Sequence, residues 1–261
     1  MKKYVSSYLI VSLGLLGNVY AQTAEEKGLF IANEVEKHDQ GWIDARISMK
    51  MILRNKQGDE STRDIRIKML EVNGDGDKSL TTFDNPRDIK GTSFLSYSHI
   101  VTADDQWLYM PALKRVKRIS SANKSGPFMG SQFAYEDLAS FEVDKYDYKY
   151  LRDETLNGIK SFVVENYPNY QYSGYSKQVV WIDKQRYIPL RVEYYDRKNA
   201  LLKVLKFNNY KQYLNSYWRA NEQVMENKQN GKVTTLTLNN YQFRNGFNER
   251  DFERNSLQRV R

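Results

Sequence analysis

Residues able to carry out nucleophilic or metal chemistry are few and scattered in this sequence of 261 residues. It contains two histidines, His38 and His99, no cysteine and no Gly-x-Ser-x-Gly motif. A zinc site needs three or four closely arranged ligands, and a catalytic triad needs a histidine beside a nucleophile. The two histidines are far apart in the sequence and lack such companions. We therefore expect no enzymatic activity, no catalytic residues, no metal site and no cofactor.

The stretch NGDGD, Asn73–Asp77, places oxygen ligands at positions 1, 3 and 5 of a calcium loop. Position 6 is Lys78 where glycine is required, and position 12 is Asp84 where glutamate is usual. Glycine and aspartate are also common hairpin residues. A turn is the favoured interpretation, with calcium binding as a remote alternative.

A cationic stretch, KRVKRISSANKSGPFMG, runs from Lys114 to Gly130. It lacks both glycine patterns of phosphate-binding loops. With the preceding WLYMPAL it predicts a strand at 107–110, a turn at 111–113 and a returning strand with its charges toward water. The candidate contacts for an anionic headgroup or an acidic partner surface are Lys114, Arg115, Lys117 and Arg118. The alternative for all four is simple solvent exposure.

Two apolar residues, Phe128 and Met129, stand in the polar, glycine-containing stretch that follows. Apolar side chains on such a loop either dock onto the core as a plug or cover an opening. The sharper prediction is a lid, with both side chains at the mouth of a cavity.

Export is predicted by the first residues of the chain. Lys2 and Lys3 precede an apolar run, Tyr8–Val19, that ends in the small-residue pattern VYA, as in a signal peptide (residues 1–21) cleaved after Ala21. The run is shorter than the ~20 residues of a membrane span. Without the two lysines the net charge falls from +8 to +6. A basic periplasmic protein without disulfides is expected, with no nucleic-acid partner.

The rest of the chain, residues 22–261, predicts a single mainly β domain. A capping box, Thr23 to Glu26, opens an amphipathic helix at about 24–39. Alternating runs such as ARISMKMILR and RDIRIKML then predict roughly ten antiparallel strands. Only Gly91–Phe94 and Ala122–Phe141 look irregular, with a short helix expected within the second stretch.

One helix cannot readily cover the concave face of a curved sheet of ten strands, so the sheet either closes tightly or leaves an apolar cavity. Five of the six methionines after residue 21 fall within one third of the chain, two of them on one face of the first strand, which would suit adaptable packing, although an ordinary core could also use them. The candidate lipid-binding residues on the helix, the strands and the loop are Ile31, Val35, Met49, Met51, Ile65, Ile67, Met69, Phe128 and Met129.

Three features of this sequence resemble the periplasmic outer-membrane lipoprotein-sorting proteins, the LolA-like carriers. They are the leader followed by one helix and many strands, the block WLYMPALKRV and the block WIDKQRYIPLRVEYYD. Three further stretches are similar to one branch of this family, which is encoded near exporters of the resistance-nodulation-division class. They are DIKGTSFLS, the long stretch from Lys114 to Leu138, and SGYSK. The resemblance covers essentially the whole mature chain. It implies an unclosed β-barrel of about eleven strands whose apolar cavity accepts acyl chains.

Together these features favour a carrier without enzymatic activity. Such a carrier would take a lipid or lipoprotein from an inner-membrane exporter or lipoprotein-release transporter toward an outer-membrane acceptor. The alternative is an accessory or sensor module that docks to the exporter without carrying lipid. Its association with the exporter would weaken steeply with salt, and its cavity would be filled by its own side chains. A lipid hydrolase is a weaker third possibility, because no nucleophile with a positioned base is evident.

Overall fold

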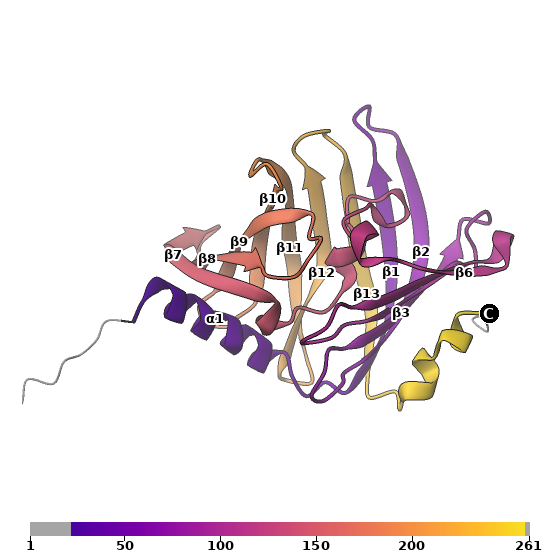
Figure 1. Ribbon diagram of the computed structural model, residues 1–261, viewed down its shortest axis with the longest axis horizontal. Helices are drawn as coiled ribbons and strands as arrows, with labels where there is room; N and C mark the ends of the chain where they lie inside the picture. The colour runs from indigo at the N-terminus through magenta and orange to yellow at the C-terminus, as the bar shows by residue number, and fades with distance from the viewer. Residues whose placement is uncertain (1–21, 259–261) are drawn as a thin grey trace, which may run out of the picture.

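The computed structural model describes residues 22–258, so the predicted signal peptide, residues 1–21, lies outside the described residues. The described chain forms one α-helix and one antiparallel sheet of thirteen strands (Figure 1). No helix within this range is long and apolar enough to span a membrane.

Helix α1 (Ala24–His38) begins at the predicted capping box. The Thr23 hydroxyl accepts a hydrogen bond from the backbone N–H of Glu26 at 3.1 Å, and the Glu26 carboxylate accepts one from the N–H of Thr23 at 2.9 Å. These two bonds satisfy backbone donors that have no partner within the helix. The helix ends at His38, one residue before the predicted boundary.

The strands follow one another in simple up-and-down order, except that β13 pairs with β1. The sheet does not close, because β6 and β7 are its two free edges, which confirms the unclosed barrel. Thirteen strands exceed the predicted ten to eleven, and one of them, β4, begins inside the stretch 91–94 that the sequence pattern leaves irregular. The bounds are β1 (Asp44–Arg54), β2 (Glu60–Leu70), β3 (Lys78–Asn85), β4 (Ser93–Tyr97), β5 (Asp105–Met110), β6 (Arg115–Arg118), β7 (Tyr146–Leu156), β8 (Ile159–Pro168), β9 (Tyr175–Asp183), β10 (Pro189–Asp196), β11 (Leu201–Tyr213), β12 (Tyr217–Asn227) and β13 (Val233–Phe243).

The alternation read from the sequence fixes which face of β1 and β2 is buried. Ile47, Met49 and Met51 are all buried, and the intervening Ser48 and Lys50 are exposed. Met49 pairs with Ile65 across the two strands. The apolar faces of both strands therefore point to the concave side of the sheet, where the largest core cluster lies.

The convex side of β3 to β5 is covered by the C-terminal segment (Figure 1). This segment forms two 3-10 turns, η6 (Glu249–Phe252) and η7 (Arg254–Gln258). Phe252 and Leu257 are fully buried there against Leu95 and Trp107. A second core thus closes the outer face at this end of the sheet.

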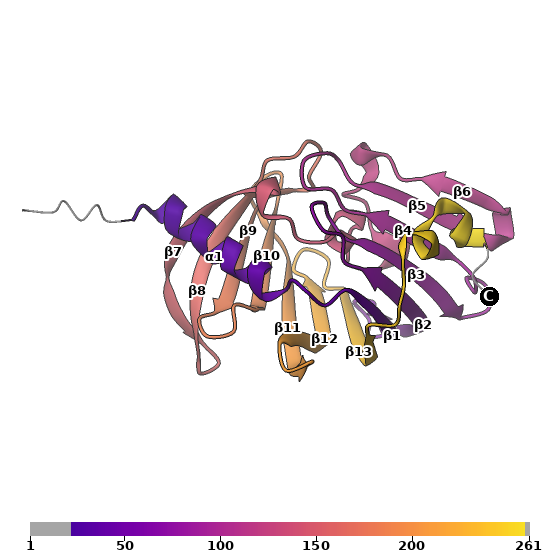
Figure 2. The ribbon, with the colours of Figure 1, turned by 90° about the horizontal axis from the view of Figure 1, so that it is seen from below.

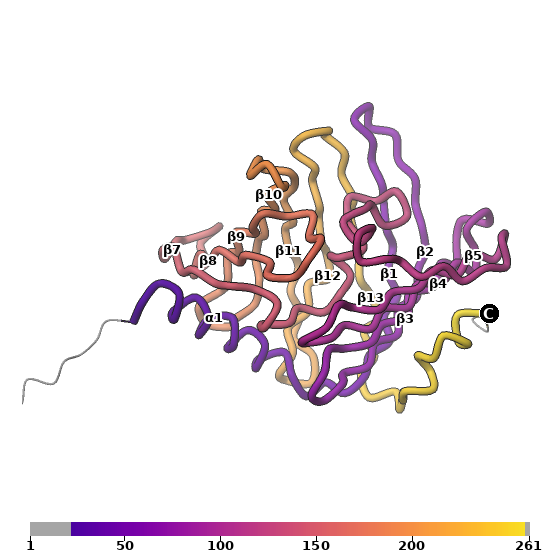
Figure 3. Tube along the Cα trace, viewed as in Figure 1, coloured from indigo at the N-terminus to yellow at the C-terminus, as the bar shows by residue number. Residues whose placement is uncertain are grey.

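Two segments occupy the concave side. Helix α1 packs along edge strand β7 and extends across the open side of the sheet (Figure 2). Gly28 permits this approach, because a Cβ atom there would lie 2.9 Å from the backbone nitrogen of Tyr150. The segment between β6 and β7 crosses the concave side (Figure 3). Its 3-10 turns, together with the turn that joins β5 to β6, are η1 (Pro111–Leu113), η2 (Ser121–Asn123), η3 (Phe128–Gly130), η4 (Tyr135–Leu138) and η5 (Val143–Lys145).

Candidate functional site

A cavity of about 1780 Å³ lies between α1 and the concave face of the sheet. Its volume exceeds the ~300–1,000 Å³ of sites for drug-sized molecules. The helix contributes Ala32 and Val35, and the segment between β6 and β7 closes another side. Strands from both halves of the sheet supply the apolar wall, which includes Ile47, Ile67, Met69, Val180, Ile182, Val192, Phe207 and Leu238.

Tyrosines add a second kind of wall to the cavity. Tyr146, Tyr175 and Tyr194 line it and lie in contact with the main core. Burial raises the pKa of Tyr146 to about 12 and raises the pKa values of Tyr175 and Tyr194 well above that of free tyrosine. The three phenols are therefore neutral at physiological pH and present aromatic faces without charge.

The opening of the cavity is rich in carboxylates. Asp77, in the turn before β3, and Glu142, just before η5, both lie there. Burial is the main cause that raises the pKa of each group to about 7, and nearby carboxylates raise it further. For Glu142 the largest of these is Asp77, followed by Glu36 of α1. Carboxylates from α1, from the turn before β3 and from the segment before η5 thus lie close together.

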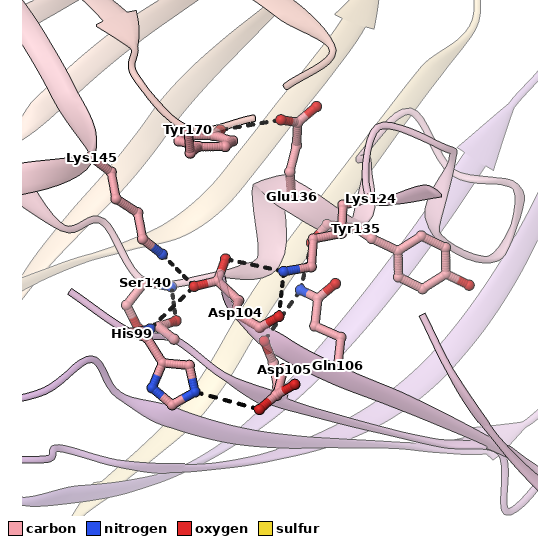
Figure 4. A network of polar contacts seen from close by, with 12 residues as sticks. His99, Asp104, Asp105, Gln106, Lys124, Tyr135, Glu136, Ser140, Lys145 and Tyr170 are labelled. Carbon is pink, nitrogen blue, oxygen red and sulfur yellow. Dashed lines mark hydrogen bonds and ion pairs between the residues drawn. The ribbon is translucent and has the colours of Figure 1, made fainter. Parts of the chain in front are cut away.

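Two lysines near this opening are already paired with another carboxylate. Lys124 and Lys145 converge on Asp104 of the loop between β4 and β5 (Figure 4). Both lysines and Asp104 have side chains that are nearly 90% buried. The two lysines therefore hold η2 and η5 onto that loop, and the three groups together carry one net positive charge when ionised.

Exposed apolar side chains surround the opening. Val101 is 91% exposed at the tip of the loop between β4 and β5, and Phe141 and Tyr172 are also exposed. All three line the outer part of the cavity. An apolar rim of this kind is typical of a surface that meets a membrane or another protein.

Phe128 does not lie at the mouth of the cavity, where the sequence analysis placed it. Its side chain is 1% exposed, and its ring centre lies 5.1 Å from that of Phe94 and 5.9 Å from that of Phe83. Strands β3 and β4 offer an aromatic pocket that favours docking over exposure. Met129 is half-buried beside it, and its carbonyl oxygen accepts a hydrogen bond from Arg63. This part of the loop is a plug.

A buried ion pair anchors the same segment to β11. The Lys203 ammonium lies 2.5 Å from the Asp137 carboxylate and donates to the carbonyl oxygen of Gln132 at 3.0 Å. Tyr175 donates to the same carboxylate at 2.7 Å. Only 3–4% of each charged side chain is exposed. The pair marks the boundary between the plug and the cavity.

The nine predicted lipid-binding residues fall into two groups. Val35, Ile67 and Met69 line the cavity. The others belong to the packed core or to the plug, and these are Ile31, Met49, Met51, Ile65, Phe128 and Met129. Alternation identified the concave face of β1 and β2 correctly, but it gave no information on which stretch of that face the plug would cover.

The cavity residues of β8 to β11 were not identified from the sequence. In β9, Val179, Val180, Trp181 and Ile182 are all buried, so both faces of the strand are apolar. A run that is apolar at every position has no alternation to separate its inner face from its outer face. The acidic opening gave a partial signal in the stretch 73–77, for which a turn was favoured and calcium binding was a remote alternative.

The four basic residues lie away from the cavity, on and beside edge strand β6. Lys114, Arg115, Lys117 and Arg118 are all exposed, and none of them lines the cavity. Arg118 pairs with Asp105 across the hairpin. The side chains are placed as the sequence predicted for a solvated strand face, and they remain available to a partner.

His99 and the NGDGD stretch support structure at the opening. The His99 ring is hydrogen-bonded to the Asp75 carboxylate at 2.7 Å, and Asp75 also accepts from the N–H of Ile100 at 3.0 Å. Asp77 accepts from the N–H of Val72 at 3.2 Å. Between residues 22 and 258, no cluster of three or more histidines and carboxylates is arranged to hold a metal ion. The stretch is a turn that ties two loops together.

Comparisons with known proteins agree with this architecture. The chain is 59% identical to a domain from Vibrio parahaemolyticus described as an outer membrane lipoprotein-sorting protein, with a TM-score of 0.88 over 90% of this chain and 99% of that one. It is 29% identical to a DUF1329 family protein from Desulfovibrio piger, with a TM-score of 0.86 over 90% of this chain and 100% of that one. Neither relative is described as an enzyme.

A more distant match and a family model complete these comparisons. A LolA superfamily protein from Nitrosomonas europaea, 20% identical, has the same fold with a TM-score of 0.70 over 90% of this chain and 100% of that one. A family model described only as that of an uncharacterized protein matches residues 75–259. No curated protein matches the chain. The chain belongs to the outer membrane lipoprotein-sorting protein family, whose fold is that of the LolA superfamily.

Proposed function

We infer that this protein is a periplasmic carrier that holds the acyl chains of a lipid or lipoprotein in its cavity. It would receive this cargo from an inner-membrane exporter of the resistance-nodulation-division class or from a lipoprotein-release transporter, and pass it toward the outer membrane. The observation that carries the proposal is the cavity of about 1780 Å³ with an apolar wall and an exposed apolar rim. Kinship with lipoprotein-sorting proteins supports it.

The burial of acyl chains supplies enough free energy for such a carrier. Each methylene group removed from water contributes about 0.8 kcal/mol, so ten methylenes contribute about 8 kcal/mol. This corresponds to a dissociation constant of about 1 μM. A preformed cavity keeps the cost of ordering low, since its wall belongs to a regular sheet.

Direct contact with the acyl chains is proposed for the residues that line the cavity. Val35, Ile67 and Met69 remain in this set, and Val180 and Phe207 join it. The six core and plug residues of the earlier prediction would support this wall from the packed part of the same concave face. Phe128 and Met129 would meet cargo only if the plug left the core, and the proposed binding does not require that movement.

The basic hairpin is proposed as the contact with a partner or with anionic headgroups. Its four cations lie on a free sheet edge, outside the cavity. Charges so exposed contribute more to the rate and orientation of association than to affinity. The alternative, a docking module that carries no lipid, uses the same hairpin but would have a cavity filled by its own side chains. The large empty volume favours the carrier.

The test is to identify what co-purifies with the mature protein from its native compartment. An organic extract of detergent-free protein is examined by mass spectrometry, and wild type is compared with Ile67→Arg, which places a charge in the cavity wall. Leu113→Arg is the matched control, since Leu113 is 60% exposed in the turn before β6 and lies outside the cavity. We expect stoichiometric lipid in wild type and control and its loss in folded Ile67→Arg. Lipid-free wild type that also fails to take up added lipid would contradict the proposal.

A further inference from the structure

The polar end of the cavity carries more negative charge than its own surroundings neutralise. Glu142 is 6% exposed, lines the cavity, and makes neither a hydrogen bond nor an ion pair through its carboxylate with any residue between 22 and 258. Glu36 and Asp77, which face it, also lack an ion-pair partner within the described residues. A buried carboxylate without a counter-charge is costly unless something else supplies one.

The nearest lysine supplies only part of this charge, since Lys145 lowers the pKa of Glu142 from nearby but forms no ion pair with it. Lys145 follows Glu142 by three residues, but its ammonium is bonded to Asp104, as Figure 4 shows. Lys124 approaches the same Asp104 carboxylate and donates to the Asp104 carbonyl oxygen. These two lysines and Asp104 carry one net positive charge when all three are ionised, which is less than the three negative charges that Glu142, Asp77 and Glu36 can carry.

The backbone at this point is shaped to bring the carboxylates together. A Cβ atom at Gly76 would lie 2.6 Å from the backbone carbonyl carbon of Ser98 and 2.7 Å from a Glu142 carboxylate oxygen, so glycine lets the turn that carries Asp77 pack against Ser98 with Glu142 beside it. Glu142 is thereby held beside Asp77, although both carry negative charge when ionised. Such an arrangement is costly to the fold in the absence of a cation.

A second group deeper in the cavity also lacks a partner. Asn166 of β8 is 5% exposed and lines the cavity, and its side-chain oxygen has no hydrogen-bond partner within the described chain. It pairs across the sheet with Tyr148, whose hydroxyl donates to the carbonyl oxygen of Val143, the residue after Glu142. An unused acceptor therefore lies on the wall next to the acidic end.

We propose that this end of the cavity binds an ammonium group, so that the preferred cargo is an amphiphile with acyl chains and a positively charged amine in its headgroup. The ammonium would lie between Glu142 and Asp77, with Glu36 nearby, and would donate hydrogen bonds to these carboxylates and toward Asn166. The inference rests on the proposed carrier function and names its substrate class. A metal ion fits less well, because the described residues offer no cluster of three ligands.

The test compares two ligands that differ in the ammonium group. Lysophosphatidylethanolamine and lysophosphatidylglycerol of the same chain length are titrated into the lipid-free mature protein by calorimetry, below their micelle-forming concentrations. We expect the ethanolamine lipid to bind about tenfold more tightly, equivalent to about 1.4 kcal/mol. Glu142→Gln and Asp77→Asn should each reduce this preference to about twofold and leave the affinity for the glycerol lipid unchanged or higher.

The controls separate this inference from the carrier function. Asp147→Asn removes one carboxylate from the exposed side of β7, outside the cavity, and should keep the full preference. Circular dichroism establishes that each variant is folded, and Asn166→Leu provides a second, uncharged probe of the same end. Equal binding of the two lipids, or tighter binding of the glycerol lipid, would overturn the ammonium site and leave the carrier intact. Binding of neither lipid would overturn both.

Discussion

The concave face of the sheet is filled at one end and open at the other. At the filled end, over β1 to β4, Phe128 and its neighbours pack against Phe83 and Phe94. At the open end, under α1, the cavity is bordered by β8 to β11 together with the start of β1 and the end of β2. The difference lies in the covering segment, since a plug seals one end and a single helix spans the other. Stability and ligand binding are therefore assigned to different ends of one surface.

The largest expected effect is at the boundary between the two ends. Lys203→Met leaves the Asp137 carboxylate buried without its ion-pair partner. We expect a loss of about 3–5 kcal/mol in the free energy of unfolding, because an uncompensated buried charge is strongly unfavourable. Urea denaturation measures the change. Lys206→Met, on the exposed face of the same strand, should change stability by less than about 0.5 kcal/mol. A loss below about 1 kcal/mol for Lys203→Met would show that the pair does not anchor the plug.

The next prediction contrasts one phenylalanine from each end. Phe128→Ala at the filled end should cost about 3–5 kcal/mol of stability, because it leaves a cavity in a packed aromatic cluster. Phe207→Ala at the open end should cost about 1 kcal/mol, because its half-buried side chain already borders empty space. Denaturation and lysolipid titration of both proteins check the comparison. Lipid affinity should fall more for Phe207→Ala, and the reverse order would contradict the division of the face.

The sequence predicted the filled end better than the open one. Alternation in β1 and β2, the capping box of α1 and the hairpin before η2 were all confirmed, because each depends on local spacing. Whether Phe128 would be a lid or a plug depended on a pocket formed by Phe83 and Phe94, more than thirty residues earlier in the chain. Such non-local packing leaves no periodic signal in the loop itself.

Most of the open end was missed for a related reason, although Val35, Ile67 and Met69 of the predicted set line the cavity. Strand β9 is apolar on both faces, so its sequence does not indicate which face borders the cavity. The acidic opening joins Glu36, Asp77 and Glu142 from three separate elements, and carboxylates so far apart in sequence cannot be grouped without the fold. The pattern of residues alone allowed either a tightly closed sheet or an apolar cavity. The resemblance to a carrier family was what favoured the cavity.

A pH-dependent prediction tests the open end. Burial, followed by repulsion from Asp77, raises the folded-state pKa of Glu142 to about 7, against about 4.3 when unfolded. The folded state therefore binds the proton more tightly, and the stability contributed by this group falls as pH rises from about 4 to above 7. Glu142→Gln should remove this loss and be about 1 kcal/mol more stable than wild type at pH 8. The charged groups that face Glu142 are Glu36, Asp77, Asp104 and Lys145.

The measurement is denaturation at pH 5 and pH 8 on lipid-free protein. Wild type should lose stability between the two values relative to Glu142→Gln, and Asp147→Asn should follow wild type. A saturating amount of lysophosphatidylethanolamine should reduce the difference at pH 8, because the ammonium would compensate the ionised carboxylate. An identical pH dependence in wild type and Glu142→Gln would rule out a buried, repelled carboxylate at this position.

The smallest effect on stability is expected at the sheet edge, which belongs to neither end of the concave face. Replacement of the basic hairpin's four cations by serine should change the free energy of unfolding by less than about 1 kcal/mol, since each is exposed and only Arg118 forms an ion pair in the described chain. Binding to vesicles of anionic phospholipid at low salt should nevertheless fall severalfold, because a clustered positive field steers association. The substituted residues are Lys114, Arg115, Lys117 and Arg118.

The control for this edge removes equal charge from elsewhere on the surface. Four exposed lysines at loops and strand ends outside the hairpin serve for this purpose, namely Lys56, Lys198, Lys228 and Lys232. If both quadruple variants lose vesicle binding equally, net charge alone explains it and the hairpin has no special role. If only the hairpin variant loses binding while lysolipid affinity in the cavity is unchanged, docking and cargo binding are separate functions of the edge and the open end.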